Sequence, residues 1–419
     1  MIRSLTIGIP VSTKSQSYIE ASCKRILQVS EDVLREANFA PRTIRYTLPP
    51  VGLEGETEGL ILSIIKFVDG LATATNVRWF CLPYNFIADG SRRERLSVAL
   101  DIVSRSPKMF LNMIVADTER LSLCAINDAA TLISQISKRS NNGFDNFRVG
   151  VSCGCPSNAP FFPFSHHKGD SMAFSFALET TGIALAVANE FGVNPNIDTY
   201  RDSLVDRLAP VLCDIQQLGK WIEQGSGCEF RGIDASFAPF PDGHTSVAML
   251  VERLSGAPVG SHGSVFITAI LTDAIRAALL KSGALPLGFN GVMYSILEDN
   301  GLASANSRRL ISLDGLISLA SVCACGVDMV PVPGNSFPEE LATVMIDIAA
   351  MSLSLKKPLG IRLLPIPGRS TNELTQFNLD FLCDSRVMGL SATDRSLESN
   401  AHAFGMLAPS RLIPIRSNV

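Results

Sequence analysis

The stretch FRVGV (residues 147–151) is nearly apolar on both faces, and MAFSF (residues 172–176) repeats the pattern. Strands of this kind are typical of a sheet that is covered on both sides, because both of its faces are then buried. Short β-branched or aromatic runs alternate along the chain with longer stretches in which apolar residues have helical spacing. This alternation predicts an α/β fold with a large parallel or mixed sheet.

We expect ten strands, with long helices between most of them. The expected helices cover residues 17–37, 57–71, 92–104, 117–138, 180–191, 199–221, 246–254, 264–281, 314–322 and 338–354. The expected strands cover residues 4–9, 43–48, 77–82, 109–115, 147–153, 172–176, 229–237, 291–296, 327–332 and 360–364.

Composition narrows the class of protein. The 419 residues are 46% apolar and 18% charged, which is typical of a packed globular chain with one large or two medium domains. The formal charge of -4 and the lack of a basic stripe argue against nucleic-acid binding. Apolar stretches such as 60–68 are too short to cross a bilayer, so we expect no membrane span. The first expected strand begins too early for a signal peptide, so we expect a cytoplasmic protein with a small-molecule partner.

The cofactor and the oligomeric state stay open. Ten cysteines in a cytosolic chain should be reduced. The pairs Cys153/Cys155 and Cys323/Cys325 have C-x-C spacing, which differs from the C-x-x-C of zinc and thioredoxin-like sites. No nucleotide-binding, zinc-protease or EF-hand motif occurs. A divalent cation and a homo-oligomer both remain compatible with the sequence.

One candidate region is GIDASFAPFPDGHTS (residues 232–246). It places Asp234 near the end of an expected strand and His244 just before an expected helix. Ligands of α/β proteins bind at the carboxyl ends of strands, and helix N-termini attract anions, so both residues are site candidates. The alternative is that Asp234 caps a turn and that His244 is an exposed residue at the start of a helix.

A second candidate region is GSHGS (residues 260–264), which precedes the next expected helix. His262 is our candidate for general acid, base or ligand, because an imidazole titrates near neutral pH. Ser261 and Ser264 flank it as candidates for substrate binding, although the pattern is not a nucleophile elbow. The alternative is a histidine that only caps the neighbouring helix.

Carboxylates and a thiol follow later in the chain. Asn290 lies in GFNGV, and Glu298 is followed directly by a second acid, a pairing that suits proton transfer or cation binding. Cys323 and Asp328 lie in CACGVDMV at the start of an apolar strand. The alternatives are that Glu298 belongs to an ordinary acidic turn and that Cys323 is an inert buried thiol.

The segment 154–170 is long for a connection in a compact domain. It holds three prolines and the adjacent histidines 166 and 167. Loops of this length are often functional, which makes His166 a candidate for binding substrate. The alternative is two exposed loop histidines.

Five motifs in order carry a resemblance to a known family. LTIGI (5–9), GIDASFAPFP (232–241), GSHGS, GFNGV and CACGVDMV together resemble the uncharacterised domain-of-unknown-function 711 family over residues 3–362. The resemblance implies a single ten-stranded α/β barrel of the pyruvate formate-lyase-like type, with a loop threaded into the barrel. It implies no agreed reaction. The segment RVMGL (386–390) departs at its last position from the R-V-x-G-Y motif of glycyl radical enzymes of that fold.

We therefore expect a barrel domain over residues 1–385 and a peripheral C-terminal extension over residues 386–419. The leading hypothesis is a cytosolic enzyme that acts on a small polar or anionic metabolite by non-radical acid/base chemistry of the lyase, isomerase or hydrolase type. The alternatives are a metabolite-binding regulator without catalysis and a glycyl-radical-type lyase. The expected catalytic residues are His262, Asp234, Glu298, Asp328 and Cys323, with Asp234, Asp328 and His262 as ligands of any metal, and the expected substrate-binding residues are His166, His244, Ser261, Ser264 and Asn290.

Overall fold

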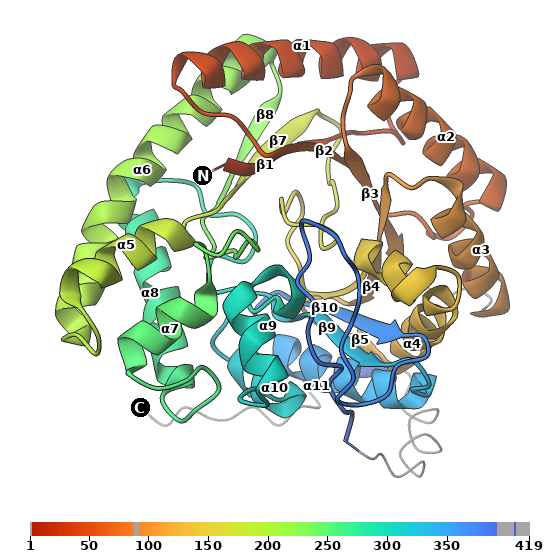
Figure 1. Ribbon diagram of the computed structural model, residues 1–419. Coiled ribbons are helices and arrows are strands. Elements are labelled where there is room, and N and C mark those ends of the chain that lie inside the picture. The colour runs from red at the N-terminus through yellow and green to blue at the C-terminus, as the bar shows by residue number, and fades with distance from the viewer. Residues whose placement is uncertain (1, 88–91, 392–405, 408–419) are drawn as a thin grey trace.

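The computed structural model describes residues 2–87, 92–391 and 406–407. Within these residues, one mixed sheet has the main strand order β8-β7-β1-β2-β3-β4-β6-β10-β9 (Figure 1). The short strands β5 and β11 lie off this path, where β5 pairs with β4 and β11 pairs with β5. The strands are β1 (Ile2–Gly8), β2 (Thr43–Thr47), β3 (Trp79–Asn85), β4 (Met109–Ala116), β5 (Leu121–Ser122), β6 (Val149–Cys153), β7 (Ala173–Leu178), β8 (Glu229–Asp234), β9 (Gly326–Pro333), β10 (Leu359–Ile366) and β11 (Met406–Leu407).

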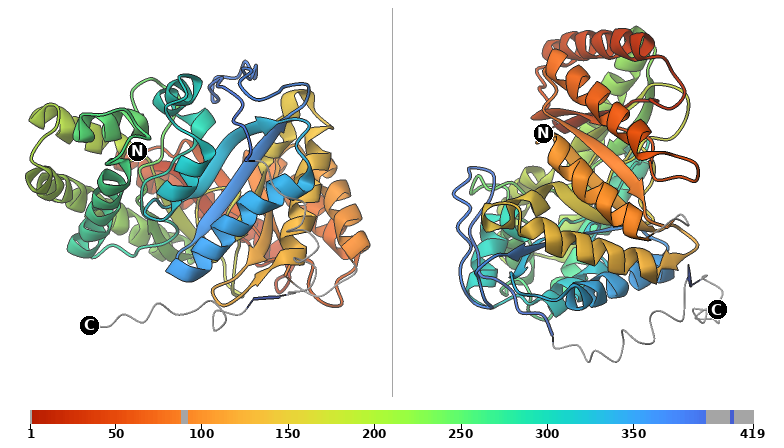
Figure 2. Two further views of the ribbon diagram at one scale, coloured as in Figure 1. Left: turned by 90° about the horizontal axis from the view of Figure 1, so that it is seen from below. Right: turned by 90° about the vertical axis from the view of Figure 1, so that its right-hand side faces the viewer.

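The helices lie around the outside of the curved sheet (Figure 1, Figure 2). In the first of them, Ile19, Cys23, Ile26 and Leu34 are buried at helical spacing, which holds one face against the sheet. The helices are α1 (Gln16–Glu36), α2 (Glu58–Ala74), α3 (Arg92–Arg105), α4 (Leu123–Ser137), α5 (Thr181–Phe191), α6 (Ile197–Ser226), α7 (Val247–Ser255), α8 (Ser264–Ser282), α9 (Asn300–Ser307), α10 (Leu313–Ala320) and α11 (Pro338–Leu355), with the 3-10 segments η1 (Asn141–Arg148) and η2 (Ile296–Glu298).

The sheet consists of three parallel blocks. Strands β1, β2, β3, β4 and β6 run in one direction. The pairs β7/β8 and β9/β10 run in the opposite direction, because β7 is antiparallel to β1 and β10 is antiparallel to β6. The predicted α/β class with a mixed sheet is therefore confirmed. The amino ends of β1 to β4 lie at the same edge as the carboxyl ends of β7 and β8.

The expected strand at 291–296 is wrong in detail. Residues 285–295 instead make isolated bridges, two to the β8 side (Ile233 with Pro286, Phe237 with Val292) and one to β9 (Ser295 with Asp328). The segment cannot form a regular ladder, because it contains a proline and left-handed backbone at Gly288 (φ 90) and Asn290 (φ 50). The edge strands β8 and β9 do not pair with each other, so hydrogen bonds between strands do not close the sheet.

The long segment 154–171 lies on the concave side of the sheet, where Figure 1 shows it in yellow inside the ring of strands. Ser4 and Thr6 of β1 each donate a hydrogen bond of 3.2 Å to the carbonyl oxygen of Pro160. From β4, the amide of Asn112 donates to the carbonyl oxygen of Ser165. Ser175 of β7 likewise donates to the carbonyl oxygen of Asn158, and Gly150 of β6 faces Pro163 and Phe164. The loop therefore covers the inner face of β6 and β7, and the helices cover the outside of the sheet (Figure 1).

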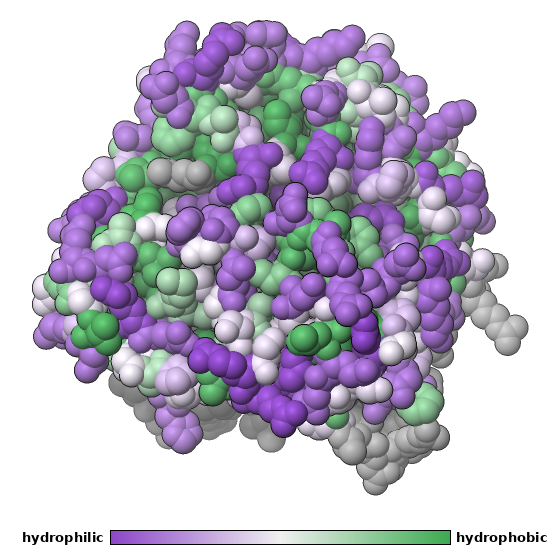
Figure 3. Space-filling model, viewed as in Figure 1, coloured by the Kyte–Doolittle hydropathy of each residue, from purple (hydrophilic) through white to green (hydrophobic). Residues whose placement is uncertain are grey.

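The molecular surface in the view of Figure 3 is mostly hydrophilic, with apolar side chains in separate patches. Of the helices in the described ranges, none combines the length and hydropathy that a bilayer-crossing segment needs. At the start of the expected C-terminal extension, Val387 and Met388 are buried. Apart from 386–391 and 406–407, the extension lies outside the described residues, and the boundary at 385/386 stays a prediction.

Candidate functional site

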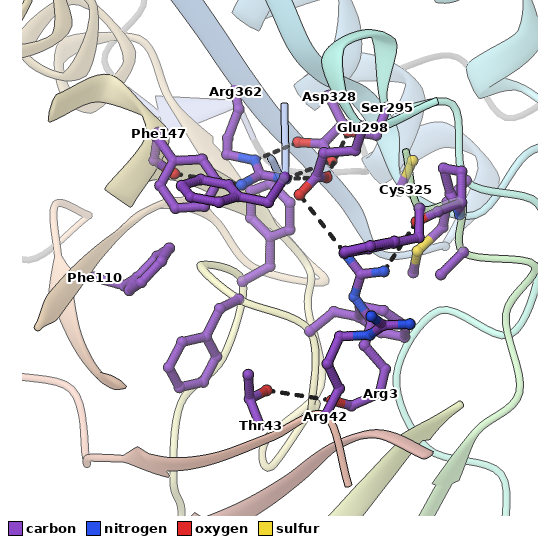
Figure 4. A pocket seen from close by; sticks show the side chains of 18 of the residues that line it. Arg3, Arg42, Thr43, Phe110, Phe147, Ser295, Glu298, Cys325, Asp328 and Arg362 are labelled. Atoms are coloured by element: carbon purple, nitrogen blue, oxygen red, sulfur yellow. Dashed lines mark hydrogen bonds and ion pairs between the residues drawn. The ribbon is translucent and has the colours of Figure 1, made fainter. Parts of the chain in front are cut away.

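A cavity of about 220 Å³ lies at the edge of the sheet where β1 to β4 begin, and Figure 4 shows its lining. The interior loop, the turn after β8 and the strands β9 and β10 complete its walls. Its lining comprises five arginines (Arg3, Arg42, Arg45, Arg78, Arg362), nine aromatic residues (Trp79, Phe110, Phe147, Phe161, Phe162, Phe164, Phe240, Phe289, Phe381), two acids (Glu298, Asp328) and six others (Thr43, Ala238, Pro239, Met293, Ser295, Cys325).

A buried ion-pair cluster forms one wall. Arg362 of β10 donates from Nε and Nη2 to the two carboxylate oxygens of Asp328 on β9, at 2.5 and 2.7 Å. Its Nη2 also contacts Oε2 of Glu298 at 3.1 Å, and this oxygen accepts a hydrogen bond of 2.6 Å from Ser295. Burial opposes ionisation of Glu298, but the positive charges of Arg362 and Arg3 outweigh it and lower its pKa. Glu298 is therefore ionised at neutral pH.

A second cluster holds the rim of the cavity. Arg42 donates two hydrogen bonds, of 3.0 and 2.8 Å, to the carboxylate of Glu179, and its guanidinium lies 3.9 Å from the ring centroid of Phe240. Arg3 donates to the same carboxylate at 3.2 Å and to the carbonyl oxygen of Pro239 at 2.9 Å. These bonds fix the start of β1 and of β2 against the residue that follows β7, and Arg3 also ties β1 to the turn after β8.

Arg45 differs from Arg362, the other buried arginine of the described residues. It is 6% exposed, and within the described residues its guanidinium makes one hydrogen bond, from Nε to Oγ1 of Thr43 at 2.9 Å. Its guanidinium lies against the rings of Trp79 and Phe162, 5.4 and 5.1 Å from their centroids. No carboxylate of the described residues forms an ion pair with it. Burial, with the nearby charge of Arg3, lowers the pKa of Arg45 to about 9, because little compensates its charge.

The electrostatic balance of the cavity favours an anion. Five lining arginines face two lining acids, Glu298 and Asp328, and the rim contributes one more acid, Glu179. Two positive charges are therefore left in excess. A buried guanidinium without a counter-ion is costly, so an anion that enters the cavity gains an unusually favourable partner.

Cys325 also lines the cavity (Figure 4), and Cys323 two residues earlier is fully buried. Both sulfur atoms lie near the carbonyl oxygen of Gly326, at 3.8 Å for Cys323 and 4.0 Å for Cys325. Contact with the Cys325 thiol, aided by the charge of Lys357, lowers the pKa of Cys323 to about 7. The contact with Cys323 and burial raise the pKa of Cys325, which keeps the cavity-facing thiol protonated.

The comparisons with known proteins agree on one family. The family model described as Uncharacterised ACR (DUF711) matches residues 1–380. The chain belongs to this family. A UPF0210 protein of Pyrobaculum arsenaticum is 28% identical over 363 residues, which cover 84% of this chain and 79% of that protein. UPF0210 proteins of Thermoanaerobacter sp. (90% of this chain, 88% of that protein) and Limosilactobacillus fermentum (93% and 91%) are each 23% identical.

These family and protein names state no activity. Membership of the DUF711 family confirms the resemblance carried by the sequence motifs. The reaction has to be argued from the site itself.

Of the residues expected at the site, Glu298 and Asp328 line the cavity. Asp234 instead lies buried beneath it, where its carboxylate accepts hydrogen bonds from the backbone N–H groups of Ser236, Phe289 and Asn290 and from the Ser236 hydroxyl. Burial raises the pKa of Asp234 to about 6 in spite of these bonds. Asn290 in turn accepts from the N–H of Ala235, so both residues hold β8 against the segment 285–295.

The other expected residues lie away from the cavity. Ser261, His262 and His244 are exposed. Ser264 is buried at the start of α8, where its hydroxyl accepts from the N–H of Gly260. Cys323 is fully buried without lining the cavity.

His166 lies in the interior loop, also outside the lining. Its Nδ1 is buried and has no hydrogen-bond partner in the part of the chain that the structure describes. Burial lowers the pKa of His166 to about 4, so its imidazole is neutral at physiological pH. Gly389, the position considered for radical chemistry, lies near Thr371 and does not line the cavity.

The proposed metal ligands do not come together. Asp328 is tied to Arg362, Asp234 to the turn at 288–290, and His262 is exposed. Across the described ranges, no group of three or more histidine, cysteine, aspartate or glutamate side chains is arranged to hold a metal ion. The candidate site is therefore formed by the lining residues, which include Asp328 but neither Asp234 nor His262.

Sequence reasoning missed the arginines for a physical reason. From the sequence we considered the carboxyl ends of strands, and in this way we identified the turn after β8. In this mixed sheet, however, the amino ends of β1 to β4 lie at the same edge as the carboxyl end of β8, and four of the five lining arginines come from those amino ends. A signal was nevertheless present. Arg45 in TIRYT and Arg362 in LGIRLLPI are charged residues inside strands that are otherwise buried, which is rare without a paired or functional role.

Proposed function

We propose that this chain is a cytosolic enzyme that binds a small anionic metabolite in the cavity and acts on it by non-radical acid/base chemistry. The observation that carries the proposal is Arg45, a buried guanidinium at the cavity wall that has no carboxylate partner among the described residues. An anion supplies the missing charge and can accept two parallel hydrogen bonds from the guanidinium. The ten free cysteines of the chain support a reducing compartment.

Glu298 is the residue we assign to proton transfer. Its Oε2 is occupied by Ser295 and Arg362, whereas Oε1 has only Arg3 nearby, at 3.6 Å. An anion bound beside Arg45 and Arg3 would compete for their positive charge and raise the pKa of Glu298 from its lowered value. Substrate binding would thereby make Glu298 a better base, as lyase, isomerase and hydrolase reactions all require.

We further propose that the sheet is a ten-stranded barrel of the pyruvate formate-lyase-like type, with residues 285–295 in the place of the tenth strand. Support comes from the isolated bridges of this segment to both sheet edges, and from the interior loop that fills the concave side. In such a barrel the cavity lies at one mouth, which shields a reaction from water.

Binding is tested with a panel of small organic anions and a thermal-shift assay. We expect at least one anion to raise the melting temperature of the protein, and Arg45→Met to weaken its binding at least tenfold. The control is Arg207→Met, which removes an exposed guanidinium on α6 that pairs with Glu190. Unchanged binding by a folded Arg45→Met variant would show that the cavity is not the anion site.

A metabolite-binding regulator is the second candidate. It is favoured by the fact that Arg362 forms ion pairs with both lining acids, as suits a purely structural role. The two candidates are separated by NMR analysis of the anion that binds, incubated with wild type and with Glu298→Gln. An enzyme converts the anion, and Glu298→Gln reduces conversion about a hundredfold while it retains binding. No conversion at saturation indicates the regulator.

A further inference from the structure

We propose that the occupant of the cavity is a flat aromatic or heteroaromatic ring that bears a single carboxylate. This inference rests on the anion binding proposed above and adds the chemical class of the anion and of the body attached to it. Three features of the lining carry it: the number of unpaired cations, the shortage of free hydrogen-bonding groups and the arrangement of the aromatic rings.

The charge of the ligand follows from the arginines. Arg3 and Arg42 are bound to Glu179, and Arg362 is bound to Asp328 and Glu298. Of the two remaining lining arginines, Arg78 is exposed to solvent, so Arg45 is the buried lining guanidinium without a carboxylate partner in the part of the chain that the structure describes. One planar guanidinium matches one carboxylate, whereas a phosphate dianion is usually bound by several cations.

The body of the ligand cannot be rich in hydroxyl groups. The lining hydroxyls are already engaged: Ser295 donates to Glu298, and Thr43 donates to the carbonyl oxygen of Arg3 and accepts from Arg45. A polyol or sugar acid would leave its hydroxyls against phenylalanine rings without partners, which costs binding free energy.

The aromatic residues are arranged to receive another ring. Phe110 lies 5.2 Å from Trp79 and 5.5 Å from each of Phe147 and Phe162, centroid to centroid, with interplanar angles of 63°, 67° and 56°. Aromatic rings prefer such tilted or edge-to-face contacts, and a ligand ring would extend the cluster in the same manner.

The cation and the rings lie together. Arg45 contacts Trp79 and Phe162 of this cluster. A carboxylate held by Arg45 therefore places its own ring directly against these aromatic side chains. This juxtaposition distinguishes the cavity from a general anion site.

The experiment uses Trp79 as a reporter. The chain has two tryptophans, and Trp221 is half exposed on α6, so Trp221→Phe leaves a single tryptophan at the cavity wall. This protein is titrated with benzoate and nicotinate, and with three comparison probes: cyclohexanecarboxylate, gluconate and benzyl alcohol. Trp79 fluorescence and isothermal titration calorimetry are recorded in parallel.

We expect the two aromatic carboxylates to bind at least tenfold more tightly than cyclohexanecarboxylate, and gluconate and benzyl alcohol to bind more weakly still. Phe110→Leu, which keeps an apolar side chain but removes the ring, should reduce the preference for benzoate over cyclohexanecarboxylate. Phe67→Leu on α2, outside the cavity, should leave this ratio unchanged.

Each other outcome overturns the inference in a recognisable way. Equal binding of benzoate and cyclohexanecarboxylate, or tighter binding of gluconate, rejects the aromatic class but leaves anion binding at Arg45 intact. Binding of benzyl alcohol as tight as that of benzoate rejects the role of the carboxylate. If neither benzoate nor nicotinate binds while other organic anions do, the proposed class of ligand is wrong. If no organic anion binds at all, both this inference and the proposed function fail.

Discussion

At the scale of single residues, Arg45 and Arg362 show that burial does not determine the role of a charge. Both lie inside strands and both are nearly inaccessible, at 6% and 4% exposure. Arg362 is saturated by two carboxylates and a backbone carbonyl, so its charge stabilises the fold. Arg45 has one neutral partner, so its charge is available to a ligand.

Removing a partner of Arg362 should be costly. We expect Asp328→Asn to lower the free energy of unfolding by about 3 kcal/mol, because it leaves a buried guanidinium undercompensated. The measurement is urea-induced unfolding. The control is Asp273→Asn, which breaks an exposed pair with Arg201 and should cost less than about 1 kcal/mol. A loss of similar size in both variants would contradict this assignment.

For Arg45 we expect the opposite effect on stability: its replacement should stabilise the ligand-free protein. Arg45→Met removes an uncompensated buried charge and keeps the apolar stem, so it should raise the free energy of unfolding by about 1 kcal/mol. Urea unfolding in a buffer without organic anions measures the effect. A strong loss of stability would mean that Arg45 has a structural partner and is not held for a ligand.

At the scale of elements, the interior loop 154–171 explains several features of the sheet. Glycines on the concave face make room for it: a Cβ on Gly360 would lie 2.6 Å from ring atoms of Phe164, and one on Gly150 would lie 2.3 Å from Pro163. Real Cβ atoms do not approach other atoms so closely, so a side chain at either position displaces the loop. Because Phe164 also lines the cavity, the sheet positions part of the site through these glycines.

Gly360→Ala therefore tests the link between the loop and the site. We expect it to lower the free energy of unfolding by about 2 kcal/mol through overpacking and to weaken anion binding, because it moves Phe164. Gly70→Ala on α2 is the matched control, since its Cβ would meet nothing within 4 Å. That substitution should stabilise the helix by up to about 1 kcal/mol and leave binding unchanged. Normal binding by Gly360→Ala would separate the loop from the site.

The loop should also make stability depend on pH. Burial lowers the pKa of His166 from 6.5 to about 4, so between these pH values the unfolded chain takes up a proton that the folded chain does not. Stability falls as pH falls through this window, by about 2 kcal/mol between pH 7 and pH 5. His166→Gln should remove this part of the pH dependence, which urea unfolding at the two pH values measures.

Two controls isolate the effect of His166. Asp234, whose raised pKa acts in the opposite direction, is present in both proteins and cancels in the comparison. His244→Gln changes an exposed imidazole and should behave like wild type. An equal pH dependence in wild type and His166→Gln would place the titrating group elsewhere.

At the scale of the whole molecule, the segment 285–295 connects the two edges of the sheet. The N–H of Met293 donates to the carbonyl oxygen of Phe237 beyond β8, and the N–H of Ala324 ahead of β9 donates to that of Val292. These bonds are few and irregular, but they are buried. They hold the turn after β8 and the start of β9 at the same cavity.

Hydrogen exchange can establish whether this connection is as firm as a strand. We expect the amides of Met293 and Ala324 to exchange in the same slow class as those of β8, because both bonds are shielded from water. The amide of Ser261, which bonds in an exposed turn, should exchange rapidly. Rapid exchange at Met293 would mean that the sheet opens readily between β8 and β9.

The α/β class was predicted correctly, and nine of the ten strands that we expected are present, because each of those strands has an apolar pattern of its own. The prediction failed at 291–296, where single bridges replace a ladder and left-handed backbone at Gly288 and Asn290 precedes them. Apolar periodicity alone does not distinguish such a segment from a regular strand. Glu298 and Asp328 were found because acids near strand ends are conspicuous. Arg45 was missed because its significance comes from the absence of a partner, and only the fold shows which groups lie around it.

The position of the interior loop has a consequence for the order of assembly during synthesis. The ribosome delivers β1 to β4 and β6 first, then the loop, and only afterwards the segment 285–295 with β9 and β10. The loop can therefore pack against the strands β1 to β4 and β6 before the sheet is complete. The later strands then cover the loop. The contact between β6 and β10 joins strands that are far apart in the sequence, so we expect this last step to be slow. A nascent chain stalled before residue 285 would expose the aromatic residues of the loop to chaperones.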